Sequence, residues 1–268
     1  MKIQNKVFVV TGAGSGIGRE ITKAIIASGG KVAGVDLRKE GLQELKKELD
    51  GKGDNLSIHE ASVADKKAVE ALPKEIMKEH GHVDGLINNA GIIQPFVKVN
   101  DLDYDAIDRV MGVNFYGTLY MIKAFLPELL KRPEGHIVNI SSMGGFLPVP
   151  GQSVYGASKA AVKLLSEGLS SELIDTNVGV TVVFPGATST NITKNSGVKS
   201  PMSEEDAKKA NIPTQSPADV AKLVVRAIQN NQLRVYAGKD SKFMNKLYRI
   251  SPDYATNLIA KQMKSLLK

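Results

Sequence analysis

Three side chains, Ser142, Tyr155 and Lys159, stand at spacings that suit acid–base chemistry. Lys159 follows Tyr155 by four residues, so on a helix the two side chains share a face and lie within a few ångströms of each other. Lowering a phenol pKa from about 10 to about 7 takes roughly 4 kcal/mol. A unit charge about 4 Å away in a partly shielded site supplies on the order of 4 kcal/mol. The spacing therefore predicts a tyrosine that exchanges protons near neutral pH, although this pair is also common on surface helices.

A glycine-rich turn follows an apolar run, 7–10, close to the N-terminus. The turn reads Thr-Gly-Ala-Gly-Ser-Gly-Ile-Gly over 11–18, and a helical pattern of apolar residues comes after it. Glycines let the backbone turn tightly and approach a ligand, and free N–H groups at a helix start favour a pyrophosphate. The residues expected to cradle the phosphates are Gly12, Gly14, Ser15, Gly16, Ile17 and Gly18.

An acidic residue, Asp36, ends the second predicted strand eighteen residues after Gly18. A carboxylate here accepts hydrogen bonds from both hydroxyls of an adenosine ribose and repels a 2′-phosphate. NAD is therefore favoured over NADP, and the adjoining Leu37 is expected beside it. The nearby Arg38 keeps NADP open as an alternative.

Several further motifs stand in a fixed order along the chain: Asn88-Asn89-Ala90-Gly91, Asn114, Ser142, Tyr155 with Lys159, and Pro185-Gly186. Together with the glycine turn they resemble the short-chain dehydrogenase/reductase family over about residues 5 to 240. The resemblance implies that Tyr155 is the general acid or base and that Ser142 donates a hydrogen bond to the substrate oxygen. It also implies that Lys159 lowers the pKa of Tyr155 and binds the nicotinamide ribose, and that Asn114 holds a water linking Lys159 to solvent.

The same resemblance implies further cofactor contacts. Besides Tyr155 and Lys159, they are Asn89, Ala90, Gly91, Pro185, Gly186, Thr188 and Thr190. The sequence departs from the family at Ser62-Val63, where an Asp-Val pair is usual, so adenine binding is expected to be weaker there. Simpler interpretations stay open: Ser142 as a turn residue, Asn114 as a paired core asparagine, and Asn88-Asn89 as a tie between strands.

Alternating patterns predict an α/β fold, a doubly wound parallel sheet of the Rossmann type with helices on both faces. Strands are expected at 7–10, 31–35, 55–59, 84–88, 135–141 and 178–184. Helices are expected at 16–29, 39–50, 65–80, 103–131, 152–175 and 216–230. Ligands bind at the carboxyl ends of strands in such sheets, and the motifs above fall at those ends.

Composition narrows the class of protein. The 268 residues are 42% apolar and 24% charged, which suits one globular domain, expected over 1–240. The absence of cysteine excludes disulfides, thiolate metal sites and a cysteine nucleophile. The four histidines are not expected to form a metal site, and His80 and His82 read as loop residues. Without a basic-then-apolar leader or an apolar run of 18 residues, the protein is expected to be cytoplasmic.

The charge of +7 is concentrated at the C-terminus, where 234–268 holds eight Lys or Arg and two Asp, a net of +6. Apolar residues at helical spacing predict an amphipathic helix in an extension over 241–268: Tyr254, Leu258, Ile259, Met263 and Leu266. It is expected to dock on its own domain or a sister subunit, with an anionic membrane surface as the alternative. Nucleic-acid binding is not expected, because the charge is confined to this tail.

The predicted function is an NAD(H)-dependent oxidoreductase that interconverts an alcohol and a ketone or aldehyde of a small molecule. An NADP(H)-dependent carbonyl reductase and a cofactor-binding sensor or scaffold without catalysis are the alternatives. The apolar stretch 143–150 suits a substrate with an apolar body, and 191–214 is expected to form a mobile flap over it. The family resemblance also implies a homo-oligomer, a dimer or tetramer, built through the helices around Asn114 and Tyr155.

Overall fold

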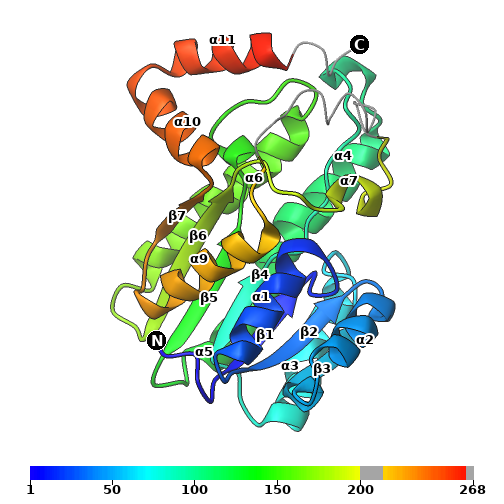
Figure 1. Ribbon diagram of the computed structural model, residues 1–268, viewed down its shortest axis with the longest axis vertical. Helices are drawn as coiled ribbons and strands as arrows, with labels where there is room; N and C mark the ends of the chain where they lie inside the picture. Colours follow the sequence, from blue (N-terminus) through cyan, green and yellow to red (C-terminus); the bar gives the residue numbers. More distant parts are fainter. Residues whose placement is uncertain (200–213, 264–268) are drawn as a thin grey trace.

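Seven parallel strands form one sheet at the centre of the protein, in the order β3-β2-β1-β4-β5-β6-β7 (Figure 1). The computed structural model describes residues 1–199 and 214–263. The strands are β1 Val7–Thr11, β2 Lys31–Asp36, β3 Leu56–Glu60, β4 Gly85–Asn88, β5 Gly135–Ile140, β6 Val178–Pro185 and β7 Arg234–Ala237. The fold class predicted from the sequence is confirmed.

Helices connect the strands and cover both faces of the sheet (Figure 1). They are α1 Gly16–Ala27, α2 Lys39–Glu48, α3 Lys66–His80, α4 Tyr104–Met111, α5 Thr118–Leu129, α6 Ser153–Glu172, α7 Ile192–Asn195, α9 Pro217–Gln229, α10 Lys239–Ile250 and α11 Pro252–Gln262. Within the described residues, no helix is both long and apolar enough to cross a membrane.

The two faces of the sheet pack into separate apolar cores because strand side chains alternate between them. On β1, Phe8 and Val10 face the core shared with α1, α2 and α9. Val9 faces the core shared with α3, α5 and α6. All five residues of β1 are buried, so this strand reads as a continuous apolar run, as expected of a parallel strand covered on both sides.

The helix predicted at 103–131 is interrupted. A π-helical turn, Gly112–Gly117, separates α4 from α5 and contains Asn114. The buried side chain of Asn114 is paired outside this helix, with Ile92 and Ser158. Periodicity alone did not reveal the turn, because an extra residue in one helical turn shifts the apolar pattern only slightly.

The C-terminal segment differs most from its prediction. The short edge strand β7 was not predicted, since its four residues carry too weak a pattern to separate from a loop. The single predicted helix is two helices, α10 and α11, which meet at Ser251 and Pro252. The first of them follows β7 closely, and its Ser241 hydroxyl donates to the carbonyl of Phe184 on β6.

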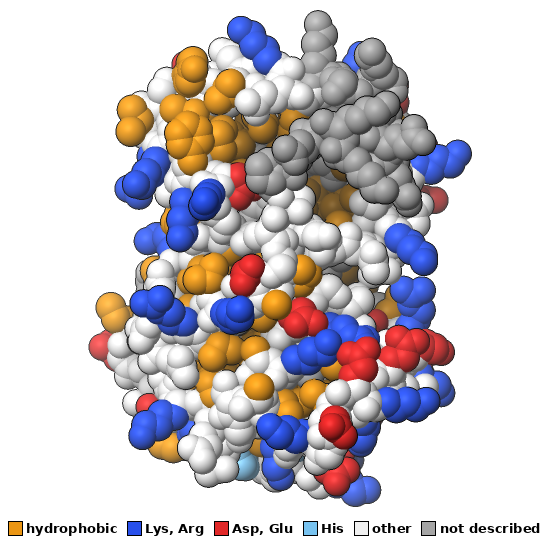
Figure 2. Space-filling model, in the orientation of Figure 1, with side chains coloured by type: hydrophobic (Ala, Val, Ile, Leu, Met, Phe, Trp, Pro, Cys, Tyr) orange, Lys and Arg blue, Asp and Glu red, His pale blue; other side chains and the backbone are white. Residues whose placement is uncertain are grey.

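The apolar side of the last helix is docked on the protein itself. Ala255 and Ile259 pack with Leu147 and Met244 in a small cluster of buried residues. The opposite side is exposed, and Figure 2 shows apolar and basic side chains together over this end of the molecule. The exposed large apolar residues of α10 and α11 are Phe243, Ile250 and Tyr254.

Two predicted features fall partly outside the described residues. Of the flap expected at 191–214, the structure describes 191–199, which includes α7, and Thr214. Leu266, expected on the amphipathic helix, also lies outside them. His80, expected in a loop, is instead the last residue of α3, and its ring approaches that of His59 on β3.

A buried carboxylate, Asp84, ties the start of β4 to its neighbours. Its oxygens accept hydrogen bonds from the Val7 backbone N–H at 3.0 Å and from Arg132 Nε at 2.9 Å. The cation of Lys6 lies 3.6 Å away, and His82 lies 3.2 Å away. This network anchors β1 and β4, the two central strands that carry cofactor motifs.

We expect Asp84→Ala to lower the free energy of unfolding by about 3 to 5 kcal/mol, because it leaves Arg132 and the Val7 N–H without their partner. Urea denaturation followed by circular dichroism measures the change. Asp54→Ala, at an exposed position, is the matched control and should change stability by less than about 0.5 kcal/mol. Equal stabilities for the two variants would contradict the anchoring role.

Candidate active site

The predicted motifs converge on one pocket of about 250 Å³ at the carboxyl ends of the central strands. Fourteen of the residues singled out in the sequence line it: Gly12, Ser15, Gly16, Ile17, Asn89, Ala90, Gly91, Ser142, Tyr155, Lys159, Pro185, Gly186, Thr188 and Thr190. The sequence analysis missed other lining residues, including Ile93 and Ser141. They stand next to recognised motifs but carry no signal of their own.

The glycine turn has the backbone that its sequence predicts. Gly12 and Gly16 have φ values of 63° and 53°, a region that L side chains rarely adopt. A Cβ on Gly18 would collide with the carbonyl of Gly12 and lie 2.5 Å from Asn89 Nδ2. The turn therefore depends on glycine for two reasons, its left-handed conformations and the close packing of its own backbone.

The start of α1 is open to a ligand. Ser15 stands at the N-cap position, but its hydroxyl makes no hydrogen bond to the N–H groups of the first helical turn. It accepts one from Asn195 Nδ2 at 3.1 Å instead. Unpaired N–H groups at the positive end of a helix dipole bind phosphate, so this end fits the pyrophosphate of a dinucleotide.

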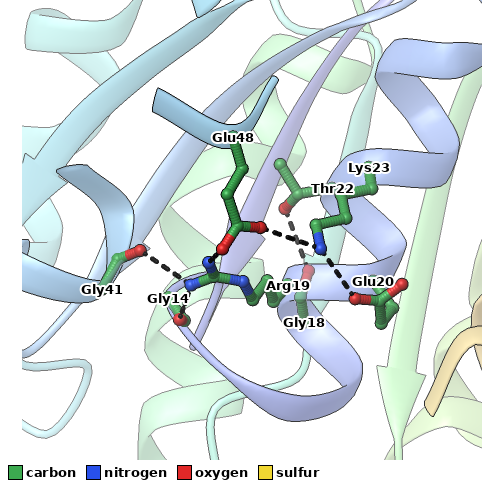
Figure 3. A network of polar contacts seen from close by, with 8 residues as sticks. All are labelled: Gly14, Gly18, Arg19, Glu20, Thr22, Lys23, Gly41 and Glu48. Carbon is green, nitrogen blue, oxygen red and sulfur yellow. Dashed lines mark hydrogen bonds and ion pairs between the residues drawn. The ribbon is translucent and has the colours of Figure 1, made fainter. Parts of the chain in front are cut away.

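An arginine on α1 holds the glycine turn against α2 (Figure 3). Arg19 Nη1 donates to the carbonyls of Gly14 at 3.1 Å and Gly41 at 3.2 Å. Its other amino group pairs with Glu48, which also pairs with Lys23 at 3.1 Å. Hydrogen bonds from Lys23 and Arg19 lower the pKa of the Glu48 carboxyl. Arg19 was not identified from the sequence, where it looks like any exposed helical arginine.

Asp36 lies at the end of β2, beside the glycine turn. Its Oδ2 accepts from the Gly14 N–H at 2.9 Å, and its Oδ1 accepts from the Arg38 N–H at 3.3 Å. These residues line a second pocket, of about 430 Å³, together with Glu40 and Glu60. Ser15 lines both pockets, so the two adjoin at the glycine turn.

The end of β4 is bound to the end of β1 through Asn89 and Thr11. Thr11 Oγ1 accepts from the backbone N–H groups of Asn89 and Ala90, both at 3.0 Å. Asn89 Nδ2 donates to the carbonyls of Thr11 at 3.0 Å and Gly12 at 3.3 Å. The interpretation of Asn88-Asn89 as a tie between strands is supported, since Asn88 also donates to Asn139 on β5.

Tyr155 and Ser142 both approach Gly144. A Cβ on that glycine would lie 3.5 Å from Ser142 Oγ and 3.6 Å from Tyr155 Cε1. Burial raises the pKa of the Tyr155 phenol, and a hydrogen bond with the Ser142 hydroxyl opposes this rise. The sequence analysis expected a lowered pKa, so the direction in this structure is the reverse, because desolvation disfavours the phenolate.

Lys159 lines the pocket and is almost fully buried. Its ammonium group donates to the carbonyl of Ile140 at 3.0 Å. Burial lowers the pKa of Lys159 to about 8. A Cβ on Gly91 would lie 3.1 Å from Lys159 Nζ and 3.3 Å from Asn114 Oδ1, so both atoms border the space above this glycine.

Asn114 ties three segments together from the π-helical turn. Its Oδ1 accepts from the Ile92 N–H at 2.9 Å, and its Nδ2 donates to the Ile92 carbonyl at 3.0 Å and to Ser158 Oγ at 2.9 Å. Ser158 in turn donates to the Tyr155 carbonyl at 2.7 Å. Both amide hydrogens are used, and Oδ1 retains the capacity to accept one more hydrogen bond.

Gln94 fixes the start of α6, the helix that carries Tyr155 and Lys159. Its Oε1 accepts from the backbone N–H groups of Val154 at 2.8 Å and Tyr155 at 3.0 Å. The side chain thereby caps the first turn of α6 and sets the position of Tyr155. This long-range contact, across 61 residues, leaves no local signal in the sequence.

Four predicted cofactor residues lie outside both of these pockets, and Gly18, packed against Gly12 and Asn89, is one of them. Leu37 is 65% exposed beside Asp36, and Val63 is buried against Gly117. The hydroxyl of Ser62 accepts from the Ala64 N–H at 3.3 Å in the turn before α3. Contacts of Leu37, Ser62 and Val63 with the cofactor therefore stay a prediction.

The segment after β6 folds back over the pocket. The Thr188 hydroxyl donates to the Gly186 carbonyl at 3.0 Å, and Thr190 packs near Gly16. Ser196, just beyond α7, accepts from the Ile93 N–H at 3.0 Å. The described part of the predicted flap thus bridges the glycine turn and the loop after β4.

Comparison with known proteins agrees with this geometry. A family model described as short chain dehydrogenase matches residues 6–200. The chain belongs to the short-chain dehydrogenase family. An oxidoreductase of Mycobacterium tuberculosis named SadH is 33% identical over 262 residues, covering 96% of this chain and 95% of the relative.

Two further relatives extend the comparison of this short-chain dehydrogenase. A fatty acyl-CoA reductase of Acinetobacter baylyi is 33% identical over 252 residues, covering 94% of this chain and 82% of the relative. A crystal structure of a short-chain dehydrogenase/reductase from Burkholderia phymatum in complex with NAD has a TM-score of 0.85, at 25% identity, covering 95% of this chain and 96% of that one. Membership of the family makes the chain an oxidoreductase with a nicotinamide nucleotide site.

Because the pKa of Lys159 is lowered in the folded protein, the stability of the dehydrogenase should depend on pH. Between a folded-state pKa of about 8 and the ordinary value of 10.5, the unfolded chain binds the proton more strongly, so stability rises with pH. Between pH 7 and pH 9.5, the free energy of unfolding of the wild type should rise by about 2 kcal/mol relative to that of Lys159→Met. Urea denaturation of both proteins at each pH measures this double difference. A difference that does not change with pH would contradict a buried, destabilised ammonium group.

Proposed function

We propose that this protein is an NAD(H)-dependent oxidoreductase that interconverts an alcohol and a ketone or aldehyde, with Tyr155 as the general acid or base. The observation that carries the proposal is the convergence of Tyr155, Ser142 and Lys159 on the wall of a pocket whose other wall is the glycine turn. Membership of the family supports this type of reaction, and the arrangement of the three side chains supports the proposed roles.

The residues of the pocket fit a dinucleotide. Gly12 and Gly16 line the pocket without side chains, and the N-cap side chain leaves the first N–H groups of α1 for a ligand. The bound nicotinamide supplies or accepts the hydride. The protein holds the substrate oxygen between the hydroxyls of Ser142 and Tyr155, and Tyr155 transfers the proton to or from it.

The raised pKa of Tyr155 bears on the direction of reaction. A protonated phenol is ready to donate to a carbonyl oxygen, which is the step that reduction needs. Oxidation of an alcohol needs the phenolate, and the ammonium group of Lys159 favours that anion. Oxidation is therefore expected to accelerate with rising pH more steeply than reduction.

A proton path from Lys159 is proposed to run past Asn114. Lys159 Nζ and Asn114 Oδ1 border the same space above Gly91, and Oδ1 can accept one more hydrogen bond. A water in that space would contact both groups and replace the proton that Tyr155 gives up. Asn114 would then be both a structural tie and a relay residue.

The preference for NAD rests on the charge of the second pocket. Three carboxylates, Asp36, Glu40 and Glu60, line it with one guanidinium group, Arg38. A ribose with free hydroxyls can donate to Asp36, whereas a 2′-phosphate would meet net negative charge. The side chain of Arg38 is exposed beside this pocket, and it is the observation that favours NADP as the second candidate.

The substrate is proposed to have an apolar body. The apolar segment 143–150 adjoins Ser142, and a fatty acyl-CoA reductase is among the relatives.

The assembly is proposed to be a homo-oligomer formed through α4, α6 and the π-helical turn. These elements carry exposed aromatic and apolar side chains: Tyr104, Tyr116 and Leu164.

We expect Tyr155→Phe to reduce kcat by at least about 100-fold, because it removes the transferable proton. NADH oxidation with a panel of ketones, followed by absorbance, measures turnover, and NADH fluorescence titration measures cofactor binding. The dissociation constant should change by less than about threefold, since the ring remains in place. Full turnover in this variant would refute the role of Tyr155.

We expect wild type to bind NAD at least about tenfold more tightly than NADP, and Asp36→Ala to remove most of this difference by weakening NAD and admitting the 2′-phosphate. Isothermal titration of both nucleotides into both proteins measures the preference. Arg38→Ala serves as the companion variant and should weaken only NADP. Tighter binding of NADP by the wild type would reverse the assignment.

A further inference from the structure

Two histidines direct their rings at one serine hydroxyl on the edge strand β3. Ser57 Oγ lies 2.8 Å from His59 Nε2 and 2.8 Å from His80 Nε2. His59 shares a strand with Ser57, and His80 ends α3, which packs on the same face of the sheet. Ser57 is near the amino end of its strand, whereas the catalytic pocket lies at the carboxyl ends. This cluster is therefore separate from the proposed active site.

A carboxylate completes the group. Glu79 precedes His80 on α3, and its Oε2 lies 3.9 Å from His59 Nε2. One ligand atom from each of His59, Glu79 and His80 lies within 4.8 Å of the other two. Two imidazole nitrogens and one carboxylate oxygen are a donor set that zinc accepts in proteins.

We propose that His59, Glu79 and His80 bind a zinc ion. Tetrahedral coordination with bonds near 2.0 to 2.1 Å places ligand atoms about 3.3 Å apart, so each atom has to move by roughly an ångström. The side chain of Glu79 is 56% exposed and free to rotate. The hydroxyl of Ser57 marks the point at which both ring nitrogens aim, and a rotation of that serine makes room for the ion.

Charged side chains surround the two rings. Glu75 and Glu79 face the rings with negative charge, and Lys31 near His80 is the opposing cation. The surroundings thus supply two carboxylates for the charge of the ion.

Zinc at this position would join β3 to the end of α3. Both ends of this link are far apart in sequence, so the ion should stabilise the folded chain without touching the catalytic residues. Three protein ligands leave a fourth position for water, as in other open zinc sites. The expected consequence is a metal-dependent stability with an unchanged nucleotide site.

The test is isothermal titration of zinc chloride into the full-length, tag-free protein after treatment with a chelator. One zinc ion per chain should bind, and the melting temperature should rise with zinc concentration. His80→Asn and His59→Asn should weaken binding by at least about tenfold, and Glu79→Gln by several-fold. X-ray absorption of the zinc complex should show two histidine nitrogens at about 2.0 to 2.1 Å.

Matched variants distinguish a zinc site from a metal-free hydrogen-bond network and from nonspecific binding of zinc to the protein surface. His82→Asn alters a neighbouring histidine outside the cluster and should bind zinc within about twofold of wild type. Ser57→Ala should keep or tighten binding, since it removes only the competing hydroxyl. Circular dichroism checks that each variant is folded. Absence of saturable binding in wild type, or unchanged binding in His80→Asn and His59→Asn, would overturn the proposal.

Discussion

The hydrogen-bonded junction between the ends of β1 and β4 is the constraint on which the site depends. Thr11 and Asn89 hold these strand ends together through their side chains and backbone. Their spacing leaves no room for a Cβ at Gly18 and places Gly91 against Lys159 and Asn114. A change in this junction would shift the glycine turn and the residues proposed for proton transfer at the same time.

Around this junction, polar groups are buried beside the candidate active site. The ammonium group of Lys159 lies among apolar strands with one carbonyl partner, and burial lowers its pKa while raising that of Tyr155. Such desolvated groups reduce stability, and the Asp84 network and the two apolar cores offset this cost. Catalytic groups with perturbed pKa values commonly stand in surroundings of this kind.

Helices from distant parts of the chain position the reactive groups. Gln94 caps the helix that carries Tyr155, Asn114 joins that helix to the loop after β4, and Arg19 clamps the glycine turn to α2. Each contact spans elements that the sheet brings together. The C-terminal helices continue this pattern, because α10 is bound to β6 and α11 packs on the segment after Ser142.

The amino-acid sequence by itself determined six of the seven strands, the glycine turn and the order of the motifs, because apolar runs, helical periodicity and glycine geometry act over a few residues. Only the tertiary structure decided the π-helical turn at Asn114, the roles of Arg19 and Gln94, and the direction of the Tyr155 pKa shift. The tertiary structure also brought the rings of His59 and His80 to the same serine hydroxyl. These features arise from contacts and desolvation between residues far apart in the chain, and such effects leave no local pattern.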